Sequence, residues 1–139
     1  MQFSRARSRP SIRVIAGEKR YSSTDPIFRK LKILKFQQIY LYLVQLFVFK
    51  FHHNKLPEIF EDFFTRNGSC HSHNTRWANM FRPPLVRSSK AARNIRVMGV
   101  RTHNYFADRL NIDCSYLSYK VALGKFLITN DINSIDVLV

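Results

Sequence analysis

The stretch FQQIYLYLVQLFVFKF, from Phe36 to Phe51, decides the fold of this chain. Its apolar residues recur with the spacing of an α-helix, and it is longer than the ~8 residues at which strands usually stop. One side comprises Phe36, Ile39, Tyr40, Leu43, Leu46 and Phe47. The opposite side is apolar as well and comprises Leu41, Tyr42, Val44, Val48 and Phe49. A helix that is apolar on nearly all sides is normally buried in a core or in lipid.

The length of this segment favours a protein core over a bilayer. At about 1.5 Å per residue it spans roughly 24 Å. A bilayer needs ~20 apolar residues, and a hydrocarbon core of roughly 30 Å is longer than this segment. Gln37, Gln38 and Gln45 also interrupt it. In so short a chain the opposite side has few partners, so we expect Tyr42, Val44 and Val48 to be exposed there.

Helix signals flank the central segment. Thr24-Asp25-Pro26 combines a capping side chain with proline at the first helical position. Leu56-Pro57 is expected to restart a helix, and Ser115–Ile128 is expected to form the last one. The apolar residues of the restarted helix are Ile59, Phe60, Phe63 and Phe64, and those expected to face partly inward on the last are Leu117, Val121, Phe126 and Ile128.

The second half of the chain carries the extended signals. Pro83-Pro84 predicts an extended segment from Met80 to Lys90. Asn94–Val100 alternates well enough to predict a short strand that ends at Gly99, and Thr102–Leu110 favours a short helix. The predicted fold is mainly α, a small helical domain with a short extended or β segment in the second half.

Length and composition indicate one domain with a modest core, since the chain has 139 residues and is 45% hydrophobic. We expect a flexible basic arm over residues 1–10, a single domain over 11–128 and a tail over 129–139. The first 23 residues loosely resemble a transit peptide, against which Pro10 argues. Cys70 and Cys114 form no disulfide framework, which favours a reduced intracellular setting, nucleus or cytoplasm.

The net charge of +14 is concentrated in two blocks. Residues 1–35 have a net charge of +8, and residues 66–110 also have a net charge of +8, whereas 36–65 and 111–139 are each at −1. Such blocks are typical of a polyanion binder, RNA or DNA. A solvated basic surface or an unfolded arm is the alternative.

Binding candidates lie in the second block, where arginines alternate with aromatic residues. Guanidinium groups bind phosphate and aromatic rings stack on bases. The candidates are Arg76, Trp77, Arg82, Arg87, Lys90, Arg93, Arg96 and Arg101. The alternative is that Trp77 and Phe81 are core residues and the arginines are merely exposed.

Neither a metal site nor a catalytic assembly is predicted. Cys70-His71-Ser72-His73 lacks the second ligand pair that a zinc site needs. The carboxylates Glu58, Glu61 and Asp62 fit the solvated face of a helix, and the sequence contains no Gly-rich phosphate loop, nucleophile elbow or HExxH. We therefore expect no metal, no cofactor and no enzymatic activity.

Several segments match the motifs of one family in order. Ile12–Ile15 is similar to the family's iRiI segment, and Thr24–Leu34 is similar to its T-x-PLF…L-x-IL stretch. Phe47–Pro57 is similar to FMYK…N-x-LP, and the phenylalanines at 60, 63 and 64 are similar to the F…F that follows. The most specific piece is close to H-x-HNTR and comprises His71, His73, Asn74, Thr75 and Arg76.

Further along, Gly99 with His103–Tyr105 resembles the motif G-P-x-x-WN-x-L-P, with His103 where the family usually has Trp. Ser118–Phe126 is similar to the closing S-x-x-x-FK. From residue 12 to 126 the chain resembles the C-terminal region of reverse transcriptases encoded by non-LTR, LINE-type retrotransposons of animals, in the jockey-like and chicken-repeat-like lineages. The resemblance implies a segment that follows the palm and thumb of an RNA-directed DNA polymerase.

The polymerase's catalytic aspartate pair has no counterpart, since no two Asp residues are adjacent in this sequence. The resemblance therefore implies a truncated, non-catalytic segment that binds nucleic acid non-specifically and, in its parent enzyme, contacts the polymerase body. Two alternatives stay open: an interaction module that packs its apolar helix on another protein, and a small membrane-associated basic protein.

Overall fold

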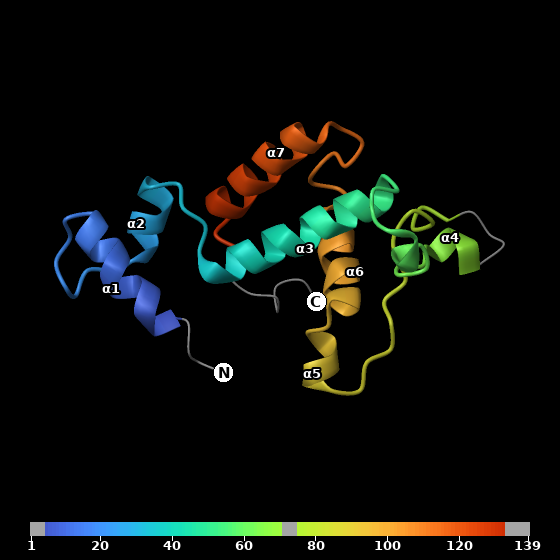
Figure 1. The fold of residues 1–139 in the computed structure, drawn as a ribbon, viewed down its shortest axis with the longest axis horizontal. Coiled ribbons are helices and arrows are strands. Elements are labelled where there is room, and N and C mark those ends of the chain that lie inside the picture. Colours follow the sequence, from blue (N-terminus) through green and yellow to red (C-terminus); the bar gives the residue numbers. More distant parts are fainter. Residues whose placement is uncertain (1–4, 71–74, 133–139) are drawn as a thin grey trace.

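The centre of the molecule is helix α3, Phe36–His52, which confirms the helix predicted for the central segment. The structure is a computed structural model that describes residues 5–70 and 75–132. Helices α6 (Ile95–Phe106) and α7 (Tyr116–Thr129) pack against α3. Figure 1 shows α3 running across the middle, with α7 along one side of it and α6 crossing it on another.

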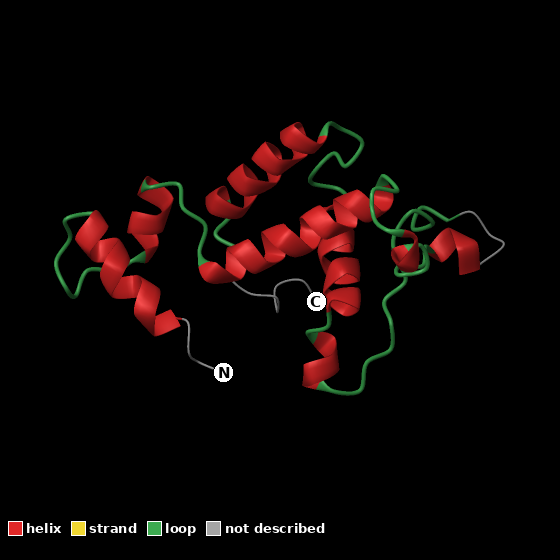
Figure 2. Cartoon of the chain, in the orientation of Figure 1, coloured by secondary structure: helices red, strands yellow, loops and turns green. Residues whose placement is uncertain are grey.

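The smaller elements lie around this centre (Figure 1). They are α1 (Arg5–Ile15), α2 (Asp25–Lys30), the 3₁₀ helix η1 (Glu58–Phe60), α4 (Asn67–Cys70) and α5 (Ser89–Ala92). In the described part of the chain the only β-type pairing is one isolated bridge between Arg66 and Phe81, and Figure 2 shows helices joined by loops. The predicted mainly α fold is confirmed.

The strand predicted for Asn94–Val100 is wrong, because these residues begin α6. The Asn94 side chain caps the helix by accepting a hydrogen bond from the Arg96 amide at 2.9 Å. Val97, Met98 and Val100 are buried against the neighbouring helices, so tertiary packing overrides a short alternation that fits two periods. Residues 82–87, before α5, are neither helix nor strand.

Three local expectations also differ from the structure. Arg5–Pro10, assigned to the arm, belongs to α1. The helix expected after Leu56-Pro57 is only the short η1. Thr24 precedes α2 as expected, but its side chain makes no capping hydrogen bond. At the other end of the chain, Ile132 is buried in the core, within the segment assigned to the tail.

The last helix has the predicted place, and Phe126 packs against the core as expected, but the fully buried residues are other ones. Tyr119, Leu123 and Leu127 are buried, whereas Leu117 and Val121 are exposed. Both sets repeat every four residues, so either could form the inner face of a helix. The buried set is the one that meets Phe49 of α3, whose ring centroid lies 4.6 Å from that of Tyr119.

The expectation that Tyr42, Val44 and Val48 form an exposed side is wrong. Val44 and Val48 are buried in the core, and Tyr42 packs against it. The exposed stripe lies on the other side and comprises Phe36, Ile39 and Leu43, with exposed fractions of 63%, 42% and 58%. The physical reason is that α6 and α7 cover two sides of α3 and leave the third open.

Two buried glutamines fix how α7 lies on α3. The Gln38 amide donates to the Leu127 carbonyl at 2.9 Å, and its oxygen accepts from the Lys35 amide at 2.9 Å. Gln45 donates to the Tyr119 hydroxyl at 2.7 Å. Burial raises the pKa of Tyr119 to about 12, so the phenol stays protonated beside Gln45. Two of the three glutamines that interrupt the apolar helix, Gln38 and Gln45, are therefore interior hydrogen-bonding groups.

Helix α2 is joined to the rest of the chain by ion pairs. The Lys35 ammonium lies 2.9 Å from the Asp25 carboxylate and 2.6 Å from the Asp131 carboxylate. Arg29 of α2 also reaches Asp131, at 2.7 Å. These pairs place cations of the first basic block beside carboxylates and partly neutralise them.

Phenylalanines form a second core beside Gly99. Phe64 and Phe81 stack with ring centroids 5.1 Å apart, and Phe51 meets both edge-on at 5.0 and 5.7 Å. A Cβ at Gly99 would lie 2.4 Å from the Phe64 ring. Gly99 is therefore required for the close approach of α6 to this cluster.

We predict opposite effects of alanine at two helical glycines. Gly99→Ala should destabilise the protein by about 1–3 kcal/mol, because the confined Phe64 ring must move. The matched control is Gly124→Ala in α7, where a Cβ meets nothing closer than 4.0 Å; it should stabilise by about 0.5–1 kcal/mol through helix propensity. Urea unfolding of both variants measures the difference. Equal effects at the two sites would contradict the close packing at Gly99.

His103 of α6 is a buried histidine packed on Phe81, with ring centroids 4.3 Å apart. Its Nδ1 has no hydrogen-bond partner among the described residues. Burial, helped by the nearby charges of Arg66 and His52, lowers its pKa from 6.5 to about 4. The folded protein therefore holds His103 neutral at physiological pH.

This low pKa predicts a loss of stability in mild acid. The unfolded chain binds a proton at His103 below pH 6.5, whereas the folded chain does not do so until about pH 4. The contribution is present above pH 6.5 and should fall by about 2 kcal/mol between pH 7 and pH 5. His103→Phe should flatten this part of the profile in urea titrations. An unchanged slope in the variant would show that another group causes the loss.

Candidate nucleic-acid interface

The second basic block forms a long segment without acidic residues. Between Asp62 and Asp108 the sequence has no Asp or Glu. The cations in this interval are Arg66, Arg76, Arg82, Arg87, Lys90, Arg93, Arg96 and Arg101. The structure divides them into cations that are held by the protein and cations that face solvent.

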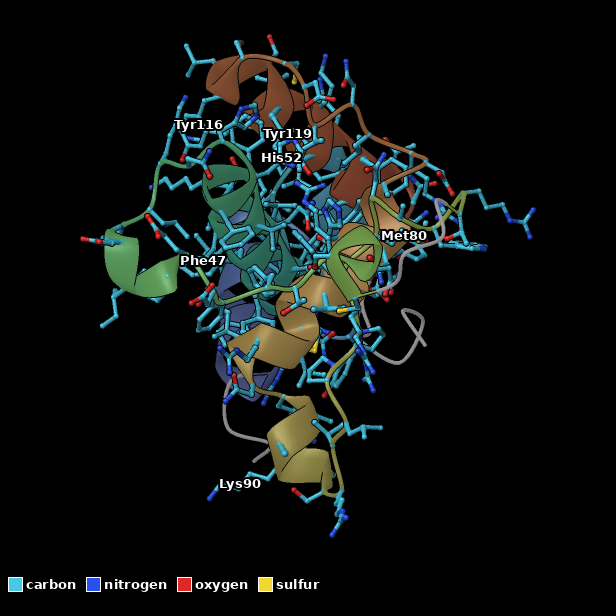
Figure 3. All side chains as sticks on the ribbon, turned by 90° about the vertical axis from the view of Figure 1, so that its right-hand side faces the viewer. Phe47, His52, Met80, Lys90, Tyr116 and Tyr119 are labelled. Carbon is cyan, nitrogen blue, oxygen red and sulfur yellow. The ribbon has the colours of Figure 1, made fainter. Side chains whose placement is uncertain are left out.

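Helix α5 presents the central part of this block. Ser88 caps the helix, its hydroxyl accepting from the Ala91 amide at 3.1 Å. The Tyr40 hydroxyl of α3 donates to the Arg93 carbonyl at 3.2 Å, which connects the end of α5 to the core. Figure 1 shows α5 projecting from the body, and in Figure 3 Lys90 lies at the far end from Tyr116 and Tyr119.

Four of the predicted residues are exposed cations on α5, next to it or on the segment that leads to it, namely Arg82, Arg87, Lys90 and Arg93. None of them pairs with a carboxylate in the described part of the chain. At Arg87, Lys90 and Arg93 the surface has positive charge that no ion pair of the described residues neutralises. Such a surface attracts a polyanion and its phosphate groups.

Arg96 is also exposed, but the protein uses its guanidinium group. It donates to the Phe63 carbonyl at 3.0 Å and to the Asp62 carbonyl at 3.4 Å. It also lies over the Phe63 ring, 5.0 Å from the centroid. Arg96 therefore connects α6 to the segment after η1. Arg101, on the same helix, is half-buried.

Trp77 is exposed, whereas Phe81 is fully buried, so the core alternative holds for Phe81 but fails for Trp77. Arg76 lies over the Trp77 ring, 5.2 Å from the centroid. The 49% exposed fraction of Trp77 leaves part of the indole open to stacking.

Part of the family motif can be placed. Thr75 and Arg76 are exposed in a turn, where the Thr75 carbonyl accepts from the Ala78 amide at 2.9 Å. His71, His73 and Asn74 lie outside the described residues. Cys70, at the end of α4, is exposed.

Arg66 has a structural role that sequence reasoning missed. It donates to His52 Nδ1 at 2.9 Å, so the His52 proton lies on Nε2, which donates to the Asp113 carboxylate at 2.9 Å. That hydrogen bond is the main cause that lowers the pKa of Asp113. No spacing rule connects residues 52, 66 and 113, so the sequence carried no signal for these two hydrogen bonds.

A pocket of about 400 Å³ opens beside Arg96. Its lining comprises Asp62, Phe63, Phe64, Thr65, Cys70, Arg82, Pro83, Pro84, Leu85, Arg96 and Val100. It therefore brings together two predicted cations, one carboxylate and an apolar surface. The sequence predicted Arg82 and Arg96 as binding residues but gave no sign of a pocket between them.

The acidic residues of the restarted helix lie at the surface. Glu58, Glu61 and Asp62 are all exposed around η1. Within residues 5–70 and 75–132, no three His, Cys, Asp or Glu side chains are grouped so as to hold a metal ion. No helix in the same ranges has the length and apolar character that a membrane crossing requires.

Comparison with known protein families, with curated proteins and with solved structures finds no match to this chain. The resemblance to reverse transcriptases therefore rests on the motifs of the sequence.

The different surroundings of Arg96 and Arg93 predict different effects of glutamine. Arg96→Gln should destabilise the protein by about 1 kcal/mol, because the carbonyls of Phe63 and Asp62 lose a charged donor. Arg93→Gln removes the same charge from the exposed surface and should change stability by less than about 0.5 kcal/mol. Thermal unfolding of the two variants at equal salt compares them. A larger loss for Arg93→Gln would overturn this division of the arginines.

Proposed function

We propose that this chain binds nucleic acid through the cations around α5, without a strong preference for base sequence. The observation that carries the proposal is the group Arg82, Arg87, Lys90 and Arg93, which is exposed and has no carboxylate partner in the described part of the chain. Each cation that neutralises a phosphate releases condensed counterions, and this release drives non-specific binding.

The geometry of the segment supports contacts with a phosphate backbone. Arg82 precedes Pro83-Pro84, whose fixed φ angles limit the conformations of the loop. Arg87 precedes the cap of α5, and Lys90 and Arg93 lie on or just after the helix. Trp77 and Arg76 add an exposed aromatic ring and a further guanidinium group upstream.

The family resemblance supports the same function, because it would place the chain in an enzyme that copies RNA into DNA. We propose a binding role and not a catalytic one. Nucleotidyl transfer needs metal-bound carboxylates in a fixed site, and the sequence has no adjacent aspartates. In a polymerase that contains this segment, the α5 surface would hold template or product strands.

The exposed stripe of α3 favours a second candidate, a protein-interaction module. Phe36, Ile39 and Leu43 repeat at the spacing of one helix face and are each more than 40% exposed. The resemblance suggests the polymerase body as the partner. Leu43→Lys should then abolish association with that body while nucleic-acid binding persists, and unchanged association would reject this candidate.

The proposal predicts a measurable dependence on salt. If the four cations each contact one phosphate of a single strand, log K should fall with log salt with a slope near −3, at about 0.7 per contact. Changing Arg87, Lys90 and Arg93 together to Gln should flatten this slope by about two units. Fluorescence anisotropy with a labelled 12-mer, between 50 and 200 mM salt, measures it.

The matched control removes three exposed cations from the first block, Lys19, Arg20 and Lys30. Its net charge equals that of the α5 variant. A slope that stays near the wild-type value in the control supports the α5 surface. A slope that flattens in the control and not in the α5 variant would place binding at the first block and overturn the proposal.

A further inference from the structure

The pocket beside Arg96 has walls from two separate segments of the chain. Phe63 and Phe64, after η1, and Val100 of α6 supply apolar surface on one side. Pro83, Pro84 and Leu85 supply it on the other. The volume of about 400 Å³ falls within the range of about 300–1,000 Å³ that is usual for small-molecule sites.

Hydrogen bonds from the main chain and from the Asn104 side chain hold the two walls together. The Arg82 amide donates to the Thr65 carbonyl at 2.8 Å, next to the bridge between Arg66 and Phe81. The Asn104 side chain accepts from the Phe81 amide at 3.1 Å and donates to the Phe81 carbonyl at 2.9 Å. The pocket is therefore preformed, and a ligand need not order it.

The polar groups at the pocket have the chemistry of a nucleotide site. Arg96 is held in place by the Phe63 and Asp62 carbonyls, and Arg82 is exposed and makes no ion pair in the described part of the chain. Guanidinium groups bind phosphate oxygens in bidentate geometry. The Asp62 carboxylate can accept hydrogen bonds from N–H groups of a base.

From this arrangement we infer that the pocket takes one unstacked nucleotide of a single strand. The base lies on the apolar surface of Phe63, Phe64 and Pro84, and its phosphate lies between Arg82 and Arg96. A duplex keeps its bases stacked, so the pocket adds affinity for single strands and little for duplex. This inference rests on the proposed binding of nucleic acid, and it names the form of nucleic acid that is preferred.

The first test fills the pocket without changing its charge. Thr65 is exposed at the rim and bonds Arg82 only through its carbonyl, so Thr65→Trp adds bulk and preserves that bond. In anisotropy titrations at 100 mM salt, we expect about a tenfold loss of affinity for a single-stranded 12-mer. Affinity for a hairpin duplex of equal charge should change by less than about twofold.

A second variant keeps the test decisive if Thr65→Trp unfolds. Arg82→Gln removes a cation at the pocket, and Arg87→Gln removes an equal charge outside it. Arg82→Gln should lower the ratio of single-strand to duplex affinity by about fivefold or more. Arg87→Gln should weaken both forms equally and leave the ratio unchanged. Equal ratios in the two variants would overturn the inference.

Alkylation of Cys70 gives an independent readout, because this thiol is exposed and lines the pocket. A bound single strand should slow its reaction with iodoacetamide more than that of Cys114, and a bound duplex should not. If single strand and duplex protect Cys70 equally, the pocket is not the site of an unstacked nucleotide. Failure of the proposed function is distinct from this, since wild type would then show no salt-dependent binding to either form.

Discussion

The fold depends on one constraint: α3 has more apolar surface than two short helices can cover. Helices α6 and α7 bury two of its sides, including Val48 and Phe49. Near its C-terminal end, Phe47 meets Phe60, Phe63 and Phe64 edge-on at 5.4–6.2 Å. The rings of Phe63 and Phe64 thus pack the segment after η1 against α3. The third side, at Phe36, Ile39 and Leu43, stays open.

Polar groups inside this apolar packing give it a defined register. A buried amide without a partner costs about 1–3 kcal/mol, and Gln38 avoids that cost only where the Leu127 carbonyl lies opposite. Gln45, two turns further along α3 than Gln38, donates to the Tyr119 hydroxyl. A one-residue shift of α7 would break both bonds at once. Apolar contact attracts α7 to α3, and the glutamines select how it lies.

The sequence predicted the parts of the fold that local signals specify. The length of the α3 segment and the helical pattern from Ser115 to Ile128 are such signals. The second part of helix α6 lies within the short helix expected over Thr102–Leu110, but its first part was predicted as a strand, because a short apolar run can fit either period and only packing decides. For the site, the cations were predictable from charge alone. The division between Arg96, bonded to the Phe63 carbonyl, and the unpaired Arg93 depends on contacts that residues 33 positions apart make in the folded chain.

Ion pairs distinguish the two basic blocks in the described part of the chain. In the first block, Asp25 and Asp131 lie against Lys35 and Arg29, so part of its field is neutralised within 3 Å. In the second, the nearest acids along the chain are Asp62 and Asp108, and Arg87, Lys90 and Arg93 form no ion pair in the described part of the chain. At physiological salt, charges more than about 8 Å apart are largely screened. Two blocks of equal formal charge therefore differ in how many of their cations are paired with carboxylates in the described part of the chain.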